Sequence, residues 1–339
     1  FMKLRVFYVI LLLFLAATSC NKEQEEQPEF TGFVSPKHFP ETTYPFETNP
    51  VTEAGFKLGR KLFYDGRLSR DGSISCGSCH IQYSAFSHVA HAVSHGIDDK
   101  LGKRNAPPIQ NAAWMQTFMW DGGVHNLDML PFNPIQNPVE MDETVSNVIL
   151  KLQADETYRQ MFSDAFGSEE INSTRMMQAF SQFMCMLISD HSRYDEYIGG
   201  NETALNTEEK EGLAIFRQKC NTCHTEPLFT NNGFKNNGMP PGNDKGRSLI
   251  TLNPADEYAF KVPSLRNIEK TMPYMHNGTL QTIDDVLNHY QSGIVQTPNL
   301  DPLLGSNFSL TNLEKERLKA FLLTLTDEKF LKNPDFSEQ

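Results

Sequence analysis

The stretch "SISCGSCHIQ", residues 73–82, sets two cysteines three positions apart and places a histidine directly after the second. The same arrangement returns at residues 220–224 as "CNTCH". The chain has only 6 Cys in 339 residues, so two short motifs hold most of its thiols. The six residues that the motifs contribute are Cys76, Cys79, His80, Cys220, Cys223 and His224.

Three chemistries are open to such cysteine pairs: disulfide formation, zinc binding and covalent haem attachment. Zinc needs four ligands, and neither motif has a second Cys/His pair close by. A disulfide within each pair leaves the following histidine unexplained. Haem c attachment explains every residue, because two thiols add to the vinyl groups of one haem and the imidazole binds its iron. We therefore predict two covalently bound haem c groups, and we expect Cys185, among Met and Phe, to be a core residue.

Helices and long loops are expected throughout the rest of the chain, and strand-like alternation is scarce. Residues 52–65 place Leu58, Leu62 and Phe63 on one helical face. A second apolar-faced helix is expected at 174–188, and Asp142 is expected to cap a helix that starts near residue 145. Capping-box signatures begin at Asn206 and Thr311, and Thr282 precedes another helix. The fold class is therefore predicted to be mainly α.

A weak internal repeat divides the chain. Residues 59–63 precede the first Cys pair, and the similar residues 212–216 precede the second. Each half then reads as a helix, a CxxCH turn, a long loop and further helices. We place the boundary near residues 199–201, so the sequence predicts domains at 51–200 and 201–332.

The first 50 residues are expected to lie outside the fold. Lys3 and Arg5 precede an apolar run that ends in "LAATSC", which predicts a lipoprotein signal over residues 1–19 with Cys20 acylated after cleavage. The alternative is an ordinary signal peptide cut near Ser19. Residues 20–50 are acidic and then proline-rich, and they predict a flexible tether. We expect a location in the periplasm, with the membrane reached only through the lipid on Cys20.

The formal net charge of -12 argues against nucleic-acid binding, which needs a basic face to displace counterions. A basic protein partner would suit such a surface better.

Longer stretches resemble the bacterial di-haem cytochrome c peroxidases and the related MauG-type enzymes. They include "LGRKLFYDGRLSRDGSISCGSCH", "GKRNAP", "FMWDGG", "PIQNPVEM", "SRYDEY", "FKVPSLRNI" and "MPYMHNGTLQTIDDV", and they cover most of residues 53–330. The resemblance implies two cytochrome c-like domains with one haem c each. The first, 51–200, would be peroxidatic, and the second, 201–332, would transfer electrons. Family members commonly pair as homodimers, so a homodimer is one expectation.

The resemblance also implies roles for residues near the first haem. Glu140, in "NPVEM", matches the catalytic glutamate, which moves a proton between the two oxygens of peroxide. His95 matches the displaceable distal ligand of the iron, with His91 as the alternative. Trp120, in "FMWDGG", matches the tryptophan between the haems.

The second iron has two candidate ligands on its distal face. Tyr290 stands where the peroxidases place a methionine and where MauG-type enzymes have tyrosine. Met275 or Met239 is the alternative, with Tyr290 then a core residue. Methionine raises the potential of haem iron, whereas an anionic phenolate favours its oxidised states.

A calcium ion is implied by the resemblance as well. Its ligands would be the side chain of Asn105 and the backbone carbonyls of Thr271 and Pro273.

Three functions follow from these assignments. The first is reduction of hydrogen peroxide with electrons from a small cytochrome c or a cupredoxin. The second is MauG-like oxidation of a partner protein by peroxide. The third is a non-enzymatic electron carrier, against which Glu140 and the "FMWDGG" stretch argue.

Overall fold

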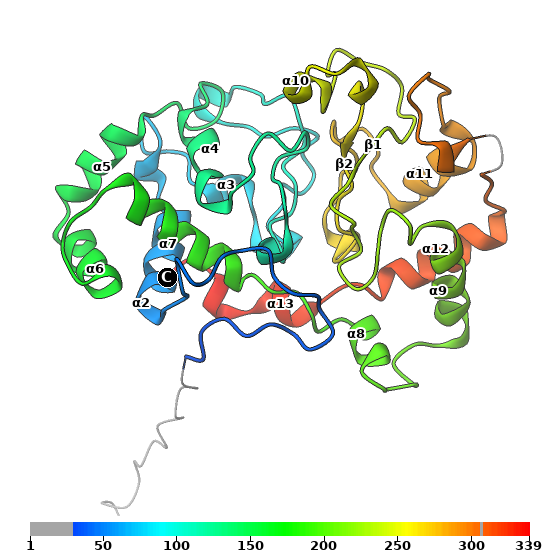
Figure 1. The fold of residues 1–339 in the computed structure, drawn as a ribbon, viewed down its shortest axis with the longest axis horizontal. Helices are drawn as coiled ribbons and strands as arrows, with labels where there is room; N and C mark the ends of the chain where they lie inside the picture. Colours follow the sequence, from blue (N-terminus) through cyan, green and yellow to red (C-terminus); the bar gives the residue numbers. More distant parts are fainter. Residues whose placement is uncertain (1–29, 306–307) are drawn as a thin grey trace, which may run out of the picture. The chain divides into compact units, whose positions relative to one another are not determined.

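The computed structural model describes residues 30–305 and 308–339, and helices predominate there (Figure 1). The helices are α2 (Glu53–Tyr64), α3 (Cys76–Cys79), α4 (Phe132–Gln136), α5 (Val145–Gln153), α6 (Glu156–Phe166), α7 (Ser173–Met186), α8 (Arg193–Ile198), α9 (Thr207–Lys219), α10 (Ser248–Thr251), α11 (Ile283–Asn288), α12 (Asn312–Leu323) and α13 (Glu328–Lys332). Strands β1 (Phe234–Lys235) and β2 (Phe260–Lys261) form an antiparallel pair. The prediction of a mainly helical fold is confirmed. The predicted signal segment, Cys20 and tether residues 20–29 lie outside the described residues.

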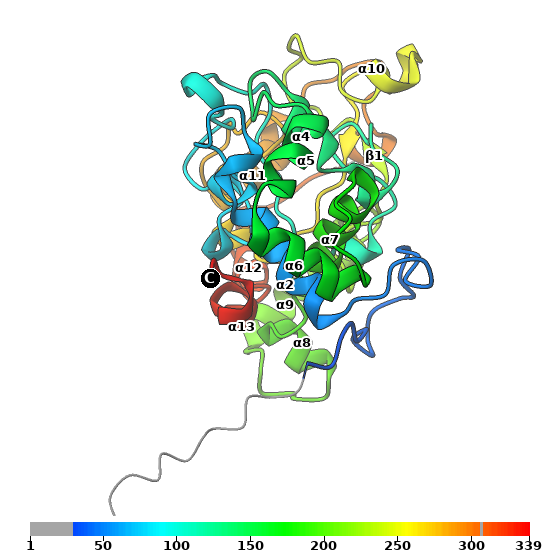
Figure 2. The ribbon, with the colours of Figure 1, turned by 90° about the vertical axis from the view of Figure 1, so that its left-hand side faces the viewer.

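Helices α2 and α7 form the core of the first half (Figure 2). Thr52 caps α2 by accepting a hydrogen bond from the Gly55 amide at 3.0 Å, and Leu58 and Leu62 are fully buried. A β-carbon on Gly59 would lie 1.9 Å from the Ala179 carbonyl oxygen. Glycine is therefore required where these two helices cross.

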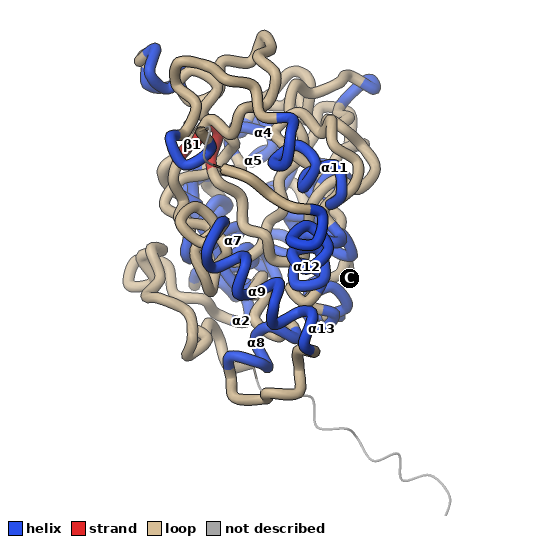
Figure 3. The backbone as a smooth tube through the Cα atoms, turned by 90° about the vertical axis from the view of Figure 1, so that its right-hand side faces the viewer, coloured by secondary structure: helices blue, strands red, loops and turns tan. Residues whose placement is uncertain are grey.

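Helices α9 and α12 repeat this arrangement in the second half (Figure 3). Both begin with the predicted capping boxes, Asn206 with Glu209 and Thr311 with Glu314. A β-carbon on Gly212 would lie 2.0 Å from the Arg317 carbonyl oxygen. The weak sequence repeat thus corresponds to a repeated helix contact with a glycine at its closest point.

Three phenylalanine rings pack together at each helix pair, and the two sets are arranged alike. Phe63 and Phe183 have ring centroids 5.1 Å apart, and Phe216 and Phe321 have theirs 5.2 Å apart. A third ring packs against each couple and comes from the loop after the CxxCH motif. The third rings are those of Phe86 and Phe229, and both residues have positive φ angles, 58° and 56°. The chain therefore builds two local cores of the same design.

The second core draws on elements from both sides of the predicted boundary. Tyr194 of α8 belongs to this core, although it precedes residue 200. In the opposite direction, Phe330 of α13 packs on Phe86 of the first half with a centroid distance of 5.8 Å. The limits of the two predicted domains stay a prediction, but each core uses residues from beyond them. The buried members of the second core are Tyr194, Leu205, Leu213, Phe216, Phe229, Ile268, Ile283, Leu287, Leu310, Leu318, Phe321, Leu322 and Leu325.

Residues 32–50 are not a tether, which corrects the prediction for this segment. They belong to the compact unit formed by Gly32–Gln339. Phe39 and Tyr44 are buried, and the Phe39 ring meets the edge of Trp114 at 5.0 Å. The Asn49 side chain donates to the Gln178 carbonyl at 2.9 Å. The segment turns at Pro36 and Pro45, and its aromatic side chains supply enough apolar area to hold it on the fold.

The cap of α5 also differs from the prediction. Thr144, directly before the first helical residue, accepts a hydrogen bond from the Asn147 amide at 3.2 Å. Asp142 lies two residues before this cap and forms an ion pair with Arg70 instead.

No helix within residues 30–305 and 308–339 combines the length and the hydropathy needed to cross a bilayer.

Candidate active site

The first CxxCH motif forms one short helix, α3, and His80 ends it. The His80 amide donates to the Cys76 carbonyl at 2.9 Å. The imidazole Nδ1 donates to the Phe86 carbonyl at 2.6 Å. Burial lowers the pKa of His80, which favours the neutral ring. A histidine held in this way presents its Nε2 lone pair to a metal, as axial haem ligands do.

The second motif holds His224 in the same way. Its Nδ1 reaches the Phe229 carbonyl at 3.2 Å and the Pro263 carbonyl at 3.1 Å. Burial also lowers the pKa of this imidazole. The positive φ angles of Phe86 and Phe229 turn each carbonyl toward its histidine, so the two backbones are shaped alike around both rings.

The thiols fit haem attachment better than the alternatives. All five described cysteines are free, so neither pair forms a disulfide. Burial raises the pKa of Cys76 and of Cys220 to about 12. Within the described ranges, neither motif belongs to a cluster of three or more metal-ligating side chains.

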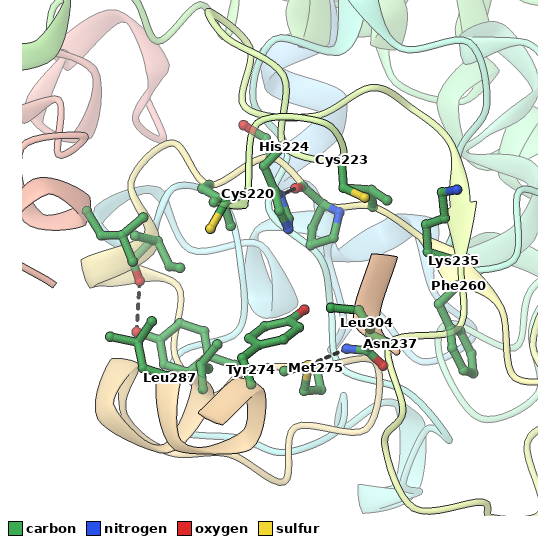
Figure 4. A pocket seen from close by; sticks show the side chains of 18 of the residues that line it. Cys220, Cys223, His224, Lys235, Asn237, Phe260, Tyr274, Met275, Leu287 and Leu304 are labelled. Carbon is green, nitrogen blue, oxygen red and sulfur yellow. Dashed lines mark hydrogen bonds between the residues drawn. The ribbon is translucent and has the colours of Figure 1, made fainter. Parts of the chain in front are cut away.

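A large cavity opens in front of the second motif (Figure 4). His224, Cys220 and Cys223 lie on one side of it, and Tyr274, Met275 and Asn237 lie across from them. Its lining is mostly apolar, as a haem pocket requires. The apolar lining residues include Phe216, Val262, Leu265, Ile268, Val286, Leu287, Leu304, Phe308, Leu310, Leu318 and Leu322.

Both candidate distal ligands of the second iron line this cavity, and Met239 is not among the lining residues. The Asn237 amide donates to the Met275 sulfur at 3.3 Å. Burial raises the pKa of Tyr290 to about 12, while a hydrogen bond with Asn237 lowers it by less. One amide therefore touches both candidates, and the choice between them stays a prediction.

Glu140 lies beside the first motif, in the turn after α4. Its carboxylate accepts a hydrogen bond from the Asn137 amide at 2.8 Å, and burial raises its pKa. Gly96 passes so close that a β-carbon would lie 2.5 Å from the Glu140 Cα. The Cys79 thiol in turn reaches the His95 carbonyl at 3.6 Å. The structure thus brings together Glu140, the predicted proton carrier, the loop that contains the predicted distal ligand His95, and the first CxxCH motif.

The loop of residues 88–95, called the histidine loop below, contains a histidine to which we assigned no role from the sequence. His88 stacks on His91 with a centroid distance of 4.3 Å, and His91 meets His95 edge-on at 4.7 Å. His91 and His95 are exposed, but His88 is buried and its Nδ1 has no partner in the described structure. Burial lowers the pKa of His88 to about 4, with a smaller contribution from His91. The close spacing of three histidines was the only signal in the sequence.

Trp120 lines the cavity of the second motif and is tied to the histidine loop. Its indole NH donates to the Asn105 carbonyl at 2.8 Å, and the Asn105 side chain donates to the His91 carbonyl at 3.1 Å. Asn105, Thr271 and Pro273, the predicted calcium ligands, all line the same cavity. Calcium binding at these residues stays a prediction.

Comparison with known proteins agrees with this arrangement. The sequence model of the family described as di-haem cytochrome c peroxidase matches residues 53–203. The methylamine utilization protein MauG of Methylorubrum extorquens is 37% identical over 295 residues, which cover 85% of this chain and 83% of that protein. Cytochrome c551 peroxidase of Nitrosomonas europaea is 33% identical over 287 residues, covering 83% of this chain and 81% of that one.

The solved structures agree too. A MauG-like protein associated with microbial copper homeostasis superposes with a TM-score of 0.78 at 34% identity, covering 89% of this chain and 97% of that one. Paired CxxCH motifs on a mainly helical fold define the class as a c-type haem protein. Within that class, the chain belongs to the di-haem cytochrome c peroxidase family. Membership of this family implies two haem c groups, and the free thiols, the oriented histidines and the apolar cavity fit them.

Proposed function

We propose that this chain reduces hydrogen peroxide to water with electrons from a small cytochrome c or a cupredoxin. Each half would form a cytochrome c-like domain with one haem c, attached at Cys76 and Cys79 in the first and at Cys220 and Cys223 in the second. When bound, the haem irons supply the redox chemistry of H2O2 + 2 H⁺ + 2 e⁻ → 2 H2O. The half-buried Glu140 carboxyl beside the first motif is the observation that carries this proposal.

Glu140 is placed to move protons. Burial raises its pKa, which favours the protonated carboxyl more than in an exposed glutamate and suits a group that accepts and returns a proton. Asn137 fixes one carboxylate oxygen at 2.8 Å and leaves the other free for substrate. We assign Glu140 the transfer of a proton from the near oxygen of peroxide to the departing one.

Electrons would enter at the second motif and pass through Trp120. The indole lines the second cavity and is linked through Asn105 to the histidine loop of the first half. His95, on that loop, would be the displaceable ligand over the first iron. Calcium at Asn105, Thr271 and Pro273 would stabilise this contact between the halves.

Two variants test the proposed role of Glu140. Glu140→Gln should lower peroxide turnover with reduced cytochrome c by about 10²- to 10⁴-fold, while the absorbance of both haems is retained. Glu169→Gln removes a carboxylate that is 64% exposed, and it should leave turnover unchanged. Near-normal turnover in Glu140→Gln would show that another group carries the proton.

A second candidate function is MauG-like oxidation of a partner protein. Tyr290 favours it, because a phenolate ligand stabilises oxidised haem iron and Tyr290 lines the second cavity. Tyr290→Phe should then change the spectrum of the second haem and shorten the lifetime of the peroxide-oxidised protein. If the spectrum does not change, Met275 or another residue binds that iron.

We further propose that the protein works in the periplasm and is held to the membrane by a lipid on Cys20. Labelling with a radioactive fatty acid tests this, since Cys20→Ala should abolish incorporation of the label.

A further inference from the structure

Lys261 ends β2 and, like Trp120, lines the cavity of the second motif. Its backbone amide donates to the Trp120 carbonyl at 2.7 Å. Its side chain turns inward, where Nζ donates to the Thr117 carbonyl at 2.9 Å and lies 3.6 Å from the Met115 sulfur. The ring of Phe118 lies 5.9 Å from the same nitrogen. The surroundings of this ammonium group are thus mainly apolar.

No carboxylate of the described residues forms an ion pair with Lys261, unlike the other lysines of the cavity. Lys219 pairs with Glu314, and Lys235 pairs with Asp301, each at 2.7 Å. Burial lowers the pKa of Lys261 to about 8, and no neighbouring charge offsets it. A buried ammonium without a counter-charge is expensive, because the charged form loses its hydration. An anion supplied by the occupant of the cavity would remove most of this cost.

Lys261 lines two cavities, the large one in front of Cys220, Cys223 and His224 and a smaller one that Met115 also lines. A haem attached in the large cavity carries two propionate carboxylates, and no other group of the haem is anionic at its periphery. We propose that Lys261 binds a propionate of the haem attached at Cys220 and Cys223, and that its charge sets the potential of that haem. The proposal rests on the proposed attachment of a haem at the second motif.

The position of Lys261 gives this pairing a functional consequence. A positive charge beside a haem stabilises the ferrous form and raises its midpoint potential. Because Lys261 is bonded through its backbone to Trp120, the paired propionate would lie next to the predicted electron path. Lys261 is therefore a positioning residue for electron transfer and not a catalytic one.

Three substitutions separate the charge of Lys261 from its structural contacts. Lys261→Met removes both the charge and the hydrogen bond to Thr117, Lys261→Gln removes the charge but keeps a donor for that carbonyl, and Lys261→Arg keeps the charge. Lys245, an exposed lysine paired with Glu257, provides the control variant Lys245→Met. Spectroelectrochemistry of the purified di-haem protein gives the midpoint potential of each haem.

We expect Lys261→Gln and Lys261→Met to lower the potential of the second haem, and Lys261→Arg and Lys245→Met to leave it close to the wild-type value. An unchanged potential in Lys261→Gln would overturn the proposal, as would a shift confined to the first haem. An equal shift in the Arg and Gln variants would show a structural role only. If Lys261→Met fails to fold, the comparison of the second haem's potential in Lys261→Gln and Lys261→Arg still tests the proposal. The measurement uses no peroxide, and a haem count on the same samples shows separately whether two haems are attached.

Discussion

A single buried ion pair ties three distant parts of the chain together, and breaking it should be costly. Arg266 follows β2, is fully buried, and forms two hydrogen bonds with Asp195 of α8 at 2.7 and 2.8 Å. Its Nε also donates to the Pro227 carbonyl at 2.9 Å, just after the second CxxCH motif. His38, from residues 32–50, contacts the same carboxylate at 3.0 Å. We expect Asp195→Asn to lower the free energy of unfolding more than a substitution in an exposed ion pair does.

The size of the effect follows from the burial of the guanidinium. The side chains of Arg266 and Asp195 are 0% and 3% exposed, so neither water nor salt can replace the lost partner. Removing one member of such a pair costs about 3–5 kcal/mol, since the other charge stays buried and unpaired. At about 2–4 °C per kcal/mol, the melting temperature should fall by about 6–20 °C.

Urea denaturation followed by far-ultraviolet circular dichroism measures this loss, and Glu53→Gln provides the control. Glu53 pairs with Lys57, but both side chains are more than half exposed, so the control should lose less than about 0.5 kcal/mol. The double variant Asp195→Asn with Arg266→Met should lose less than the sum of its single changes, because it leaves no unpaired charge. A loss below about 1 kcal/mol in Asp195→Asn would refute this reasoning.

The same pair predicts the effect of acid. Burial alone would raise the pKa of Asp195, but the hydrogen bonds and charge of Arg266 outweigh it and leave the pKa below its ordinary value. A carboxyl whose pKa is lower in the folded state stabilises the fold above its unfolded pKa of about 3.9. That stabilisation is lost as the pH falls through the folded-state pKa. The stability difference between wild type and Asp195→Asn should therefore shrink below about pH 4, and a constant difference would contradict the assignment.

Three further predictions concern the other parts of the chain. Because burial raises the pKa of Glu140, the acid limb of a kcat/KM–pH profile for peroxide should lie above the ordinary glutamate value of about 4.3, and a limb at that value would show a solvated carboxyl. Gly212→Ala should cost about 1–3 kcal/mol of unfolding free energy from overpacking, only partly offset by about 1 kcal/mol of helix propensity, whereas Gly242→Ala meets open space and should be neutral in the same urea titration. Phe39→Ala should cost about 3 kcal/mol by thermal and urea unfolding, since the ring is buried against Trp114; no change would restore the tether prediction for residues 32–50.

The sequence alone determined the chemistry that depends on neighbours along the chain. The first CxxCH motif is one helical turn, so the spacing of its two thiols and its imidazole is set locally and suits attachment of one haem wherever the segment lies. Capping boxes at Asn206 and Thr311 are equally local, and both form as predicted. The prediction was wrong for α5, where Asp142 and Thr144 were both near the start of the helix and Thr144 is the residue that caps it.

Only the tertiary structure decided the features that depend on segments far apart in the sequence. The rings of Phe33 and Phe39 lie against Trp114, which is distant in the sequence, so composition alone made this segment look like a tether. Burial of His88, the Arg266–Asp195 pair and, within the described part of the chain, the lack of a carboxylate paired with Lys261 likewise arise from packing between segments that no local pattern connects. Charge and burial are properties of a three-dimensional neighbourhood, and for this reason the cost of an unpaired charge is visible only once the chain has folded.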